Sequence, residues 1–300
     1  MKRPNFFILG APRCGTTSLC DYLRKHPRVF VCYPKEIHFF AEDFPSCRVS
    51  KILDDYLRFF SGATEKHLAV GEGAVLYLYS KVAVKKIWEY DPKSKLIVFI
   101  RNHVDFLQSW HAHQVFIGLE KITELKKAWN AENERRRMTN RTYLRKDPKF
   151  FYYSDIGKLG EQLERVYSIF PREQVKVILN EDFALSPRRV YQDILGFLNV
   201  PDDQREIFPR YNRNKVSQYP RLISFLTDPP VFIGWLTDTI KKVLHIKRFG
   251  ITRFFLRAGR KYTERVPLDP SFRKELIDYF RDDREKLSRL INRDLTHWEN

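Results

Sequence analysis

The stretch FFILGAPRCGTTSL, residues 6–19, decides how the fold begins. Residues 6–9 form a continuous apolar run, which is typical of a strand that is covered on both faces. A turn bounded by glycines follows, and residues 17–25 continue with the periodicity of a helix. In such a turn the backbone N–H groups and the helix dipole point toward one place, where an anion is stabilised. The stretch therefore predicts a strand, an anion-binding loop and a helix in succession.

The loop has the glycine spacing of a P-loop but lacks its lysine. Gly10 and Gly15 are spaced as in that motif, whereas Thr16 occupies the position of the expected lysine. Arg13 is the substitute cation, because it keeps the positive charge and adds paired donors. Backbone amides and hydroxyl groups complete the set. The predicted anion-binding residues are Arg13, Cys14, Gly15, Thr16, Thr17 and Ser18.

The alternation of strand and helix continues along the chain. Further strands are predicted at residues 95–100 (KLIVFI) and 174–179 (QVKVIL). Helix patterns cover residues 105–116, 156–170, 187–198 and 270–291. Asp269 is the predicted N-cap of the last helix, with proline directly after it. This order predicts an α/β fold, a P-loop-like parallel sheet flanked by helices on both faces.

Two basic stretches interrupt the alternation, at about residues 121–149 and 231–265. We expect a single domain over residues 1–300, in which these stretches are partly helical insertions. They are interpreted either as solvated faces or as surfaces that contact nucleotide, a polyanionic acceptor or a membrane surface.

Composition limits the class of protein. The chain has 54 Lys and Arg against 37 Asp and Glu, a net charge of +17, which favours an anionic partner. Its four cysteines show no metal-ligand spacing and are predicted to be free thiols in a reducing compartment. No apolar run reaches the roughly 18 residues of a membrane-spanning helix. We therefore expect a cytoplasmic protein that holds no metal.

The strand at 95–100 ends on Arg101 and Asn102, whereas enzymes that hydrolyse nucleoside triphosphates often hold Mg²⁺ with an aspartate at such a place. The anion-binding loop is therefore predicted to bind phosphate or sulfate without a tightly held magnesium ion. An ATP-dependent P-loop kinase remains an alternative from another class. A nucleic-acid-binding module is suggested by charge alone, and no reader motif supports it.

Three segments in order resemble the sulfotransferases that use 3′-phosphoadenosine-5′-phosphosulfate (PAPS). They are residues 6–19, PKEIHFF at 34–40, and KLIVFIRNHVDFLQSWHAH at 95–113. The likeness is to the branch with bacterial carbohydrate-type enzymes and heparan sulfate sulfotransferases. It implies the sulfotransferase fold, PAPS as donor without a metal, and sulfuryl transfer to a hydroxyl of a carbohydrate or glycoconjugate. Sulfation of a small-molecule or lipid alcohol is the alternative, and a member of the fold that has lost catalysis is a further one.

The resemblance also implies roles for individual residues. Glu36 matches the general base, and burial among Ile37, Phe39 and Phe40 is expected to raise its pKa. His38 is the rival base, or it orients Glu36 or the acceptor. The remaining roles concern the donor PAPS. Arg13 contacts its 5′ side, and the matches for its 3′-phosphate and for the C-terminal nucleotide loop are Arg101, Ser109 and Arg260.

The chain departs from that branch in two places that were expected to contact the acceptor. Ala41 follows the HFF sequence where heparan sulfate enzymes have an acidic residue, and Glu72-Gly73 stand where a lysine is common. A heparan-like acceptor is therefore not carried over. The sequence names neither the acceptor and the position sulfated nor the oligomeric state.

Overall fold

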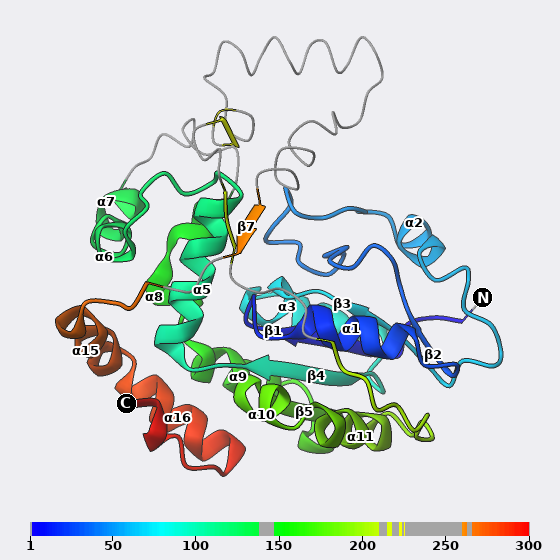
Figure 1. The fold of residues 1–300 in the computed structure, drawn as a ribbon. Helices are drawn as coiled ribbons and strands as arrows, with labels where there is room; N and C mark the ends of the chain where they lie inside the picture. Colours follow the sequence, from blue (N-terminus) through cyan, green and yellow to red (C-terminus); the bar gives the residue numbers. More distant parts are fainter. Residues whose placement is uncertain are drawn as a thin grey trace, which may run out of the picture. The chain divides into compact units, whose positions relative to one another are not determined.

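The computed structural model describes residues 2–137, 147–209, 215–217, 222–223, 225, 260–262 and 266–299 (Figure 1). These residues form two compact units. The first unit comprises Met1–Phe106, Gly157–Asn212 and Glu275–Asn300, and the second comprises Leu107–Ile156 and Arg213–Lys274. The expectation of one domain over residues 1–300 stays a prediction.

The first unit is built on a five-stranded sheet in which every neighbouring pair is parallel. The strand order is β2-β3-β1-β4-β5, and helices flank the sheet (Figure 1). The strands are β1 (Phe6–Gly10), β2 (Val29–Val31), β3 (Ala69–Gly73), β4 (Lys95–Ile100) and β5 (Val175–Leu179). The predicted α/β fold with a parallel sheet is confirmed.

Burial explains which strands could be seen in the sequence. Every residue of β1 is buried, as is every residue of β4 after its first, so both appear as continuous apolar runs. The strands β2 and β3 escaped sequence analysis. Only three residues form β2, and β3 has the sequence AVGEG, whose glycines and glutamate do not favour a strand.

Helices of the first unit pack against this sheet and against one another. They are α1 (Thr16–Arg24), α2 (Leu53–Arg58), α3 (Leu76–Tyr79), α4 (Ala83–Tyr90), α9 (Leu159–Tyr167), α10 (Asn180–Leu185), α11 (Pro187–Phe197) and α16 (Arg281–Ile291), with the 3₁₀ turns η3 (Arg172–Gln174) and η4 (Thr296–Glu299). The helix predicted at 270–291 is two helices, because the chain breaks at Phe280 between α15 (Pro270–Tyr279) and α16. The helix predicted at 156–170 is shorter, and α9 forms its regular part.

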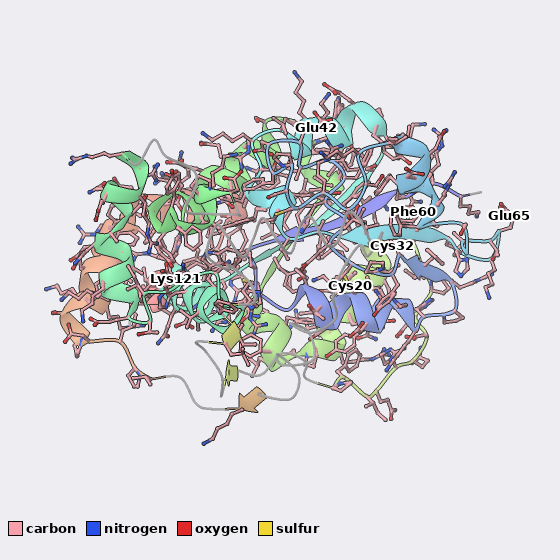
Figure 2. All side chains as sticks on the ribbon, turned by 90° about the horizontal axis from the view of Figure 1, so that it is seen from above. Cys20, Cys32, Glu42, Phe60, Glu65 and Lys121 are labelled. Atoms are coloured by element: carbon pink, nitrogen blue, oxygen red, sulfur yellow. The ribbon has the colours of Figure 1, made fainter. Side chains whose placement is uncertain are left out.

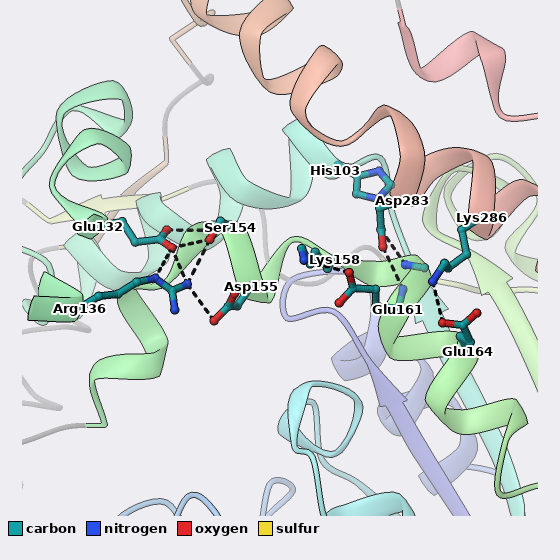
Figure 3. Close-up of polar contacts among 11 residues, drawn as sticks. His103, Glu132, Arg136, Ser154, Asp155, Lys158, Glu161, Glu164, Asp283 and Lys286 are labelled. Atoms are coloured by element: carbon teal, nitrogen blue, oxygen red, sulfur yellow. Dashed lines mark hydrogen bonds and ion pairs between the residues drawn. The ribbon is translucent and has the colours of Figure 1, made fainter. Parts of the chain in front are cut away.

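A buried carboxylate joins three segments of the first unit. Asp283 on α16 accepts hydrogen bonds from the backbone N–H groups of Gly160 (2.7 Å) and Glu161 (2.9 Å) in the first turn of α9. Its Oδ2 also lies 2.8 Å from Nε2 of His103, at the start of α5 (His103–Phe116) (Figure 3). The carboxylate thus satisfies orphan donors at a helix N-terminus and fixes the chain just after β4.

The second unit continues α5 and adds short elements. These are α6 (Leu125–Asn130), α7 (Glu132–Arg137), η2 (Pro148–Phe151), α8 (Tyr153–Ile156) and the antiparallel pair β6 (Lys215–Ser217) and β7 (Arg260–Tyr262). Asp269 caps α15 as predicted, since its Oδ1 accepts the N–H of Phe272 at 3.0 Å. Of the predicted insertion at 231–265, only β7 falls among the described residues.

Buried glutamates organise the helical part of the second unit. Glu120 accepts two bonds from the guanidinium of Arg135, at 2.8 and 2.9 Å, and one from the Tyr153 hydroxyl at 2.9 Å. Glu132 contacts Arg136 and Ser154 in a second cluster (Figure 3). Much of the basic character of residues 121–137 is therefore used in ion pairs. Within the described part of the chain, no helix has the length and apolar character needed to cross a membrane.

Candidate active site

The site of interest lies where β1 and β4 end. The two strands are parallel neighbours, with Gly10 beside Phe99 in the register, so their carboxyl ends share one edge of the sheet. From β1 the chain passes through α1 to β2 on one side, whereas β4 lies on the other side. Ligands of open α/β sheets bind at such a reversal of strand order. The loop after β1 and the residues after β4 are therefore placed together.

Two glycines give the loop its course. Gly10 has φ +149°, and a Cβ there would lie 2.6 Å from the carbonyl oxygen of Phe99. Gly15 has φ +103° and is the N-cap of α1. Both positions need glycine, one for the close approach of β4 and both for the positive φ. The loop therefore delivers residues 11–15 directly to the N-terminus of α1, where the helix dipole favours an anion.

Positive charge gathers at this loop. Burial, and then the neighbouring guanidinium of Arg101, lower the pKa of Arg13. Arg13 itself has a left-handed backbone, with φ 70°. The Nδ2 group of Asn180, which follows β5, donates to the carbonyl of Cys14 at 2.9 Å and braces the loop from a third strand end. Two arginines held close enough to repel each other form a set of donors that suits an anion with several charges.

The segment PKEIHFF lies against the end of β3. The N–H of Glu36 donates to the carbonyl of Gly73 at 2.8 Å, and the N–H of His38 donates to the Glu72 carboxylate at 3.2 Å. Glu36 and His38 both have left-handed backbones, with φ 65° and 55°. We call residues 34–40 the PKE segment.

Lys35 connects the PKE segment to the anion-binding loop, and sequence analysis did not select it. Its Nζ lies 3.3 Å from the Thr16 hydroxyl and 3.2 Å from the Thr17 hydroxyl. The same nitrogen is 2.9 Å from Oε1 of Glu36. The missing lysine after Gly15 could have prompted a search for a second cation besides Arg13, and Lys35 places one beside the two threonine hydroxyls.

Glu36 is brought to the loop, but its environment differs from the expected one. Its side chain is 42% exposed and pairs with Lys35. The apolar neighbours Ile37 and Phe40 are buried in the core, and Phe39 stacks on Tyr56 at 4.4 Å between ring centroids. The Glu36 side chain remains half-exposed, so the expected burial of the carboxylate among these side chains is wrong.

His38 is placed inside the protein. It is 6% exposed, and burial lowers its pKa to about 4. Its ring packs edge-on against Tyr77. Among the residues that the structure describes, none forms a hydrogen bond with its Nδ1. Because its ring is buried, His38 is a weaker candidate for the base than Glu36, whose side chain is 42% exposed.

Glu72, the penultimate residue of β3, has its side chain in the core. It is 0% exposed, and its Oε2 accepts hydrogen bonds from the hydroxyls of Tyr56 and Tyr77, both at 2.9 Å. Burial raises the pKa of Glu72 to about 7, although these hydrogen bonds act in the opposite direction. The expectation that this position concerns acceptor contacts is therefore wrong for the Glu72 side chain.

Arg101 and its neighbours are arranged around the start of α5. Arg101 is largely buried and forms an ion pair of 3.1 Å with Asp105, one turn into the helix. Asn102 caps the helix, since its Oδ1 accepts the N–H of Val104 at 2.9 Å. Where an ATP-hydrolysing enzyme would present a magnesium-binding aspartate, this chain has a structural cap, which disfavours the kinase alternative.

Other predicted residues lie on the same elements or in the second unit. Thr16 and Ser18 on α1 are buried, at 3% and 6% exposed, and Thr17 is partly exposed. Ser109 lies on α5, in the part that belongs to the second unit, and is 4% exposed. Arg260 begins β7, so its backbone is described, and its predicted role stays a prediction.

The cysteines and histidines outside the site have structural surroundings. The four cysteines are free thiols, as predicted; Cys20 lies on α1 and Cys32 just after β2 (Figure 2). His111 lies 2.9 Å from the carbonyl of Ile122 and packs within the second unit. The described ranges hold no group of three or more histidine, cysteine, aspartate or glutamate side chains that could bind a metal ion.

Comparisons with known proteins agree with this geometry. A family model described as "Sulfotransferase domain" matches residues 3–224. The crystal structure of a sulfotransferase from Alicyclobacillus acidocaldarius is 29% identical, with a TM-score of 0.72 over 100% of both chains. Bifunctional heparan sulfate N-deacetylase/N-sulfotransferase 3 of Mus musculus and enzyme 2 of Homo sapiens are each 25% identical over 97% of this chain. The chain spans 30% of the length of these two relatives.

Proposed function

The chain belongs to the sulfotransferase family, and from that premise we propose that it transfers a sulfuryl group from PAPS to a hydroxyl of a carbohydrate or glycoconjugate. One observation carries the residue assignments. Lys35 lies between the hydroxyls of Thr16 and Thr17, at the N-terminus of α1, and the carboxylate of Glu36. The ammonium group of Lys35 therefore contacts both the anion-binding loop and the candidate base.

The residues present suit PAPS as the donor. Arg13, Lys35 and the N-terminus of α1 supply positive charge for a phosphosulfate, and Arg101 supplies a charged donor for the 3′-phosphate. Ser109 and Arg260 complete the proposed set, the first at the 3′-phosphate and the second in the nucleotide loop. When bound, PAPS supplies the sulfuryl group and leaves as adenosine 3′,5′-bisphosphate (PAP).

The work of the protein is then positioning and charge stabilisation. Arg13 and Lys35 hold negative charge at the loop, where preformed donors need no reorganisation during the reaction. Glu36 accepts the proton of the acceptor hydroxyl at its carboxylate. Since Lys35 pairs with Glu36 in this structure, an anion at the loop competes with Glu36 for the ammonium group. A Lys35 ammonium group held by such an anion would leave the Glu36 carboxylate available to the acceptor hydroxyl.

The acceptor class rests on two kinds of support. Two relatives carry heparan sulfate in their names, and the PKE segment resembles the carbohydrate-type branch. A sugar alcohol also needs a base more than a phenol does, because its hydroxyl is much less acidic. The same relatives are named N-sulfotransferases, so an amine of a glucosamine unit is the competing acceptor group.

The test is turnover of ³⁵S-labelled PAPS with matched acceptors. The panel holds a neutral oligosaccharide, an oligosaccharide with free glucosamine amines and its N-acetylated form, a phenol and a lipid alcohol. We expect label on the N-acetylated oligosaccharide, which offers hydroxyls and no free amine. Label confined to the free-amine sugar assigns N-sulfation, and label on the phenol or lipid alone rejects a carbohydrate acceptor.

The catalytic assignment has its own variant. Glu36→Gln is expected to fold, to bind PAP with unchanged affinity, and to lose turnover by about 10²–10⁴-fold, which is the usual contribution of a general base. A matched control is Glu42→Gln, an exposed glutamate of the neighbouring turn. Near-normal turnover by Glu36→Gln, together with loss in His38→Ala, would transfer the role of base to His38.

We also propose that the protein acts in the cytoplasm, because its four thiols are free and a reducing compartment keeps them so. The two compact units are proposed to act as one sulfotransferase domain. The basic stretches at 121–149 and 231–265 are proposed as the surfaces for an anionic acceptor, with membrane contact as the alternative.

A further inference from the structure

Glu72 has a combination of properties that the proposed chemistry does not use. It is the fully buried carboxylate at the end of β3, next to the strand β1 that leads into the anion-binding loop. Leaving a carboxylate in a core is costly unless hydrogen bonds compensate it. Packing alone does not explain a buried glutamate, whereas the hydrogen bonds that Glu72 forms do.

The carboxylate of Glu72 is connected to the PKE segment twice. Directly, it accepts the N–H of His38 at 3.2 Å. Indirectly, the Tyr77 hydroxyl donates to Glu72 at 2.9 Å and accepts the N–H of Phe40 at 3.3 Å. A third bond comes from the next residue of β3, since the carbonyl of Gly73 accepts the N–H of Glu36 at 2.8 Å. The end of β3, together with Tyr77 on α3, therefore fixes the backbone of residues 36–40 at alternate positions.

These hydrogen bonds act on residues whose backbone conformation is energetically unfavourable. Glu36 and His38 have φ of 65° and 55°, in the left-handed region that is unfavourable for residues with a Cβ. Such a conformation persists only when its surroundings impose it. The His38 N–H bond to Glu72 and the Glu36 N–H bond to Gly73 are the local constraints, so the placement of the Glu36 side chain depends on them.

Tyr56 on α2 completes the cluster. Its hydroxyl donates to the same oxygen as Tyr77, and burial raises the pKa of both phenols well above the ordinary value. The phenols therefore keep their protons and remain hydrogen-bond donors to Glu72. The Glu72 side chain, which accepts hydrogen bonds from two phenols and one amide, is therefore held rigidly.

We propose that Glu72 is a positioning residue for catalysis: its carboxylate anchors the backbone of the PKE segment so that Glu36 is presented beside Lys35 and the anion-binding loop. The inference rests on the proposed function, because it assumes that Glu36 is the base. The structural part, that Glu72 holds the segment, stands independently of any reaction.

The test compares Glu72→Gln with Glu42→Gln, which replaces an exposed glutamate in the same stretch of chain. A glutamine at 72 keeps the shape of the side chain but replaces one acceptor oxygen by a donor, against three incoming donors. We expect PAP affinity by calorimetry to be unchanged, kcat to fall by about 10- to 100-fold, and hydrogen exchange at the His38 amide to accelerate. Glu42→Gln is expected to change none of the three.

Turnover and hydrogen exchange at His38 distinguish failure of the proposed function from failure of the proposed anchor. A wild-type protein without sulfuryl transfer to any acceptor rejects the proposed function, while slow exchange at His38 that accelerates in Glu72→Gln still supports the anchor. An active wild type and a folded Glu72→Gln with kcat within twofold and unchanged exchange overturn the anchor and leave the function intact. If Glu72→Gln does not fold, Tyr77→Phe decides. This variant is expected to lower kcat about 3- to 10-fold with PAP affinity unchanged, and unchanged kcat or failure to fold overturns the proposal.

Discussion

Replacing Glu72 by glutamine changes how the stability of the protein depends on pH. Burial raises the pKa of this carboxyl from its ordinary 4.5 to about 7. Between these values the folded protein binds a proton that the unfolded chain has released, so the free energy of unfolding falls as pH rises. A glutamine binds no proton. The stability of the wild type relative to Glu72→Gln should therefore decline across this window.

The size of the effect follows from the two pKa values. Each pH unit between them corresponds to about 1.4 kcal/mol. Because the ordinary pKa lies just below pH 5 and the folded one well below pH 8, the wild type should lose about 2.5 kcal/mol relative to the variant between these pH values. Most of this loss should occur below pH 7.

Groups that face Glu72 do not interfere. Burial places the pKa values of Tyr56, Tyr77 and Cys32 above their ordinary values, and that of His38 at about 4. None of them changes charge between pH 5 and 8, and more distant groups cancel in the comparison of two nearly identical proteins.

Urea unfolding at pH 5, 6, 7 and 8, followed by circular dichroism and extrapolated linearly, measures the difference. Glu42→Gln, which replaces an exposed glutamate, serves as the control for the loss of a carboxylate. A difference for Glu72→Gln that stays constant within 0.5 kcal/mol, on the order of the usual error of additivity, refutes the reasoning. Such a result means that Glu72 is ionised in the folded protein at pH 5.

Two predictions concern the anion-binding residues. Arg101→Ala should weaken PAP binding by about 10- to 100-fold, the value of a charged hydrogen bond, and leave AMP binding unchanged; calorimetry without metal tests this against Arg58→Ala on α2, and an equal loss for both nucleotides would contradict the 3′-phosphate assignment. Lys35→Met should slow single-turnover transfer by about 10- to 100-fold, with partial recovery in Lys35→Arg. Lys25→Met, at the end of α1, is the control, and transfer within twofold of wild type in Lys35→Met would remove Lys35 from the site.

The predictable part of the fold lies where local pattern and tertiary environment agree. The strands β1 and β4 are apolar throughout because both faces of the sheet are covered, and Gly10 and Gly15 mark the turn between β1 and α1. The break at Phe280 could not be predicted in this way. Helical periodicity continues across it, and the two helices are separated by packing of α16 against α9.

Arg13 and Arg101 could be selected as candidates from the sequence because they follow a known spacing, and the structure brings them close enough to interact. The role of Glu72 could not be predicted from the sequence, because its partners Tyr56 and Tyr77 come from other elements. No residue spacing indicates a buried acid. The surroundings of Glu36 were misjudged for a related reason. Apolar neighbours in the sequence do not bury a residue when their side chains enter the core and its own side chain pairs with a lysine instead.

The bond between His103 and Asp283 has a consequence for the order of events during synthesis. The two residues are 180 positions apart, and His103 follows Arg101 by two residues. While the ribosome is still making the middle of the chain, β1, β4 and the loop between β1 and α1 can already associate. The turn that carries Arg101 meets Asp283 only after α16 has emerged. The nascent protein therefore forms its sheet early. The surroundings of Arg101 are completed among the last events of folding.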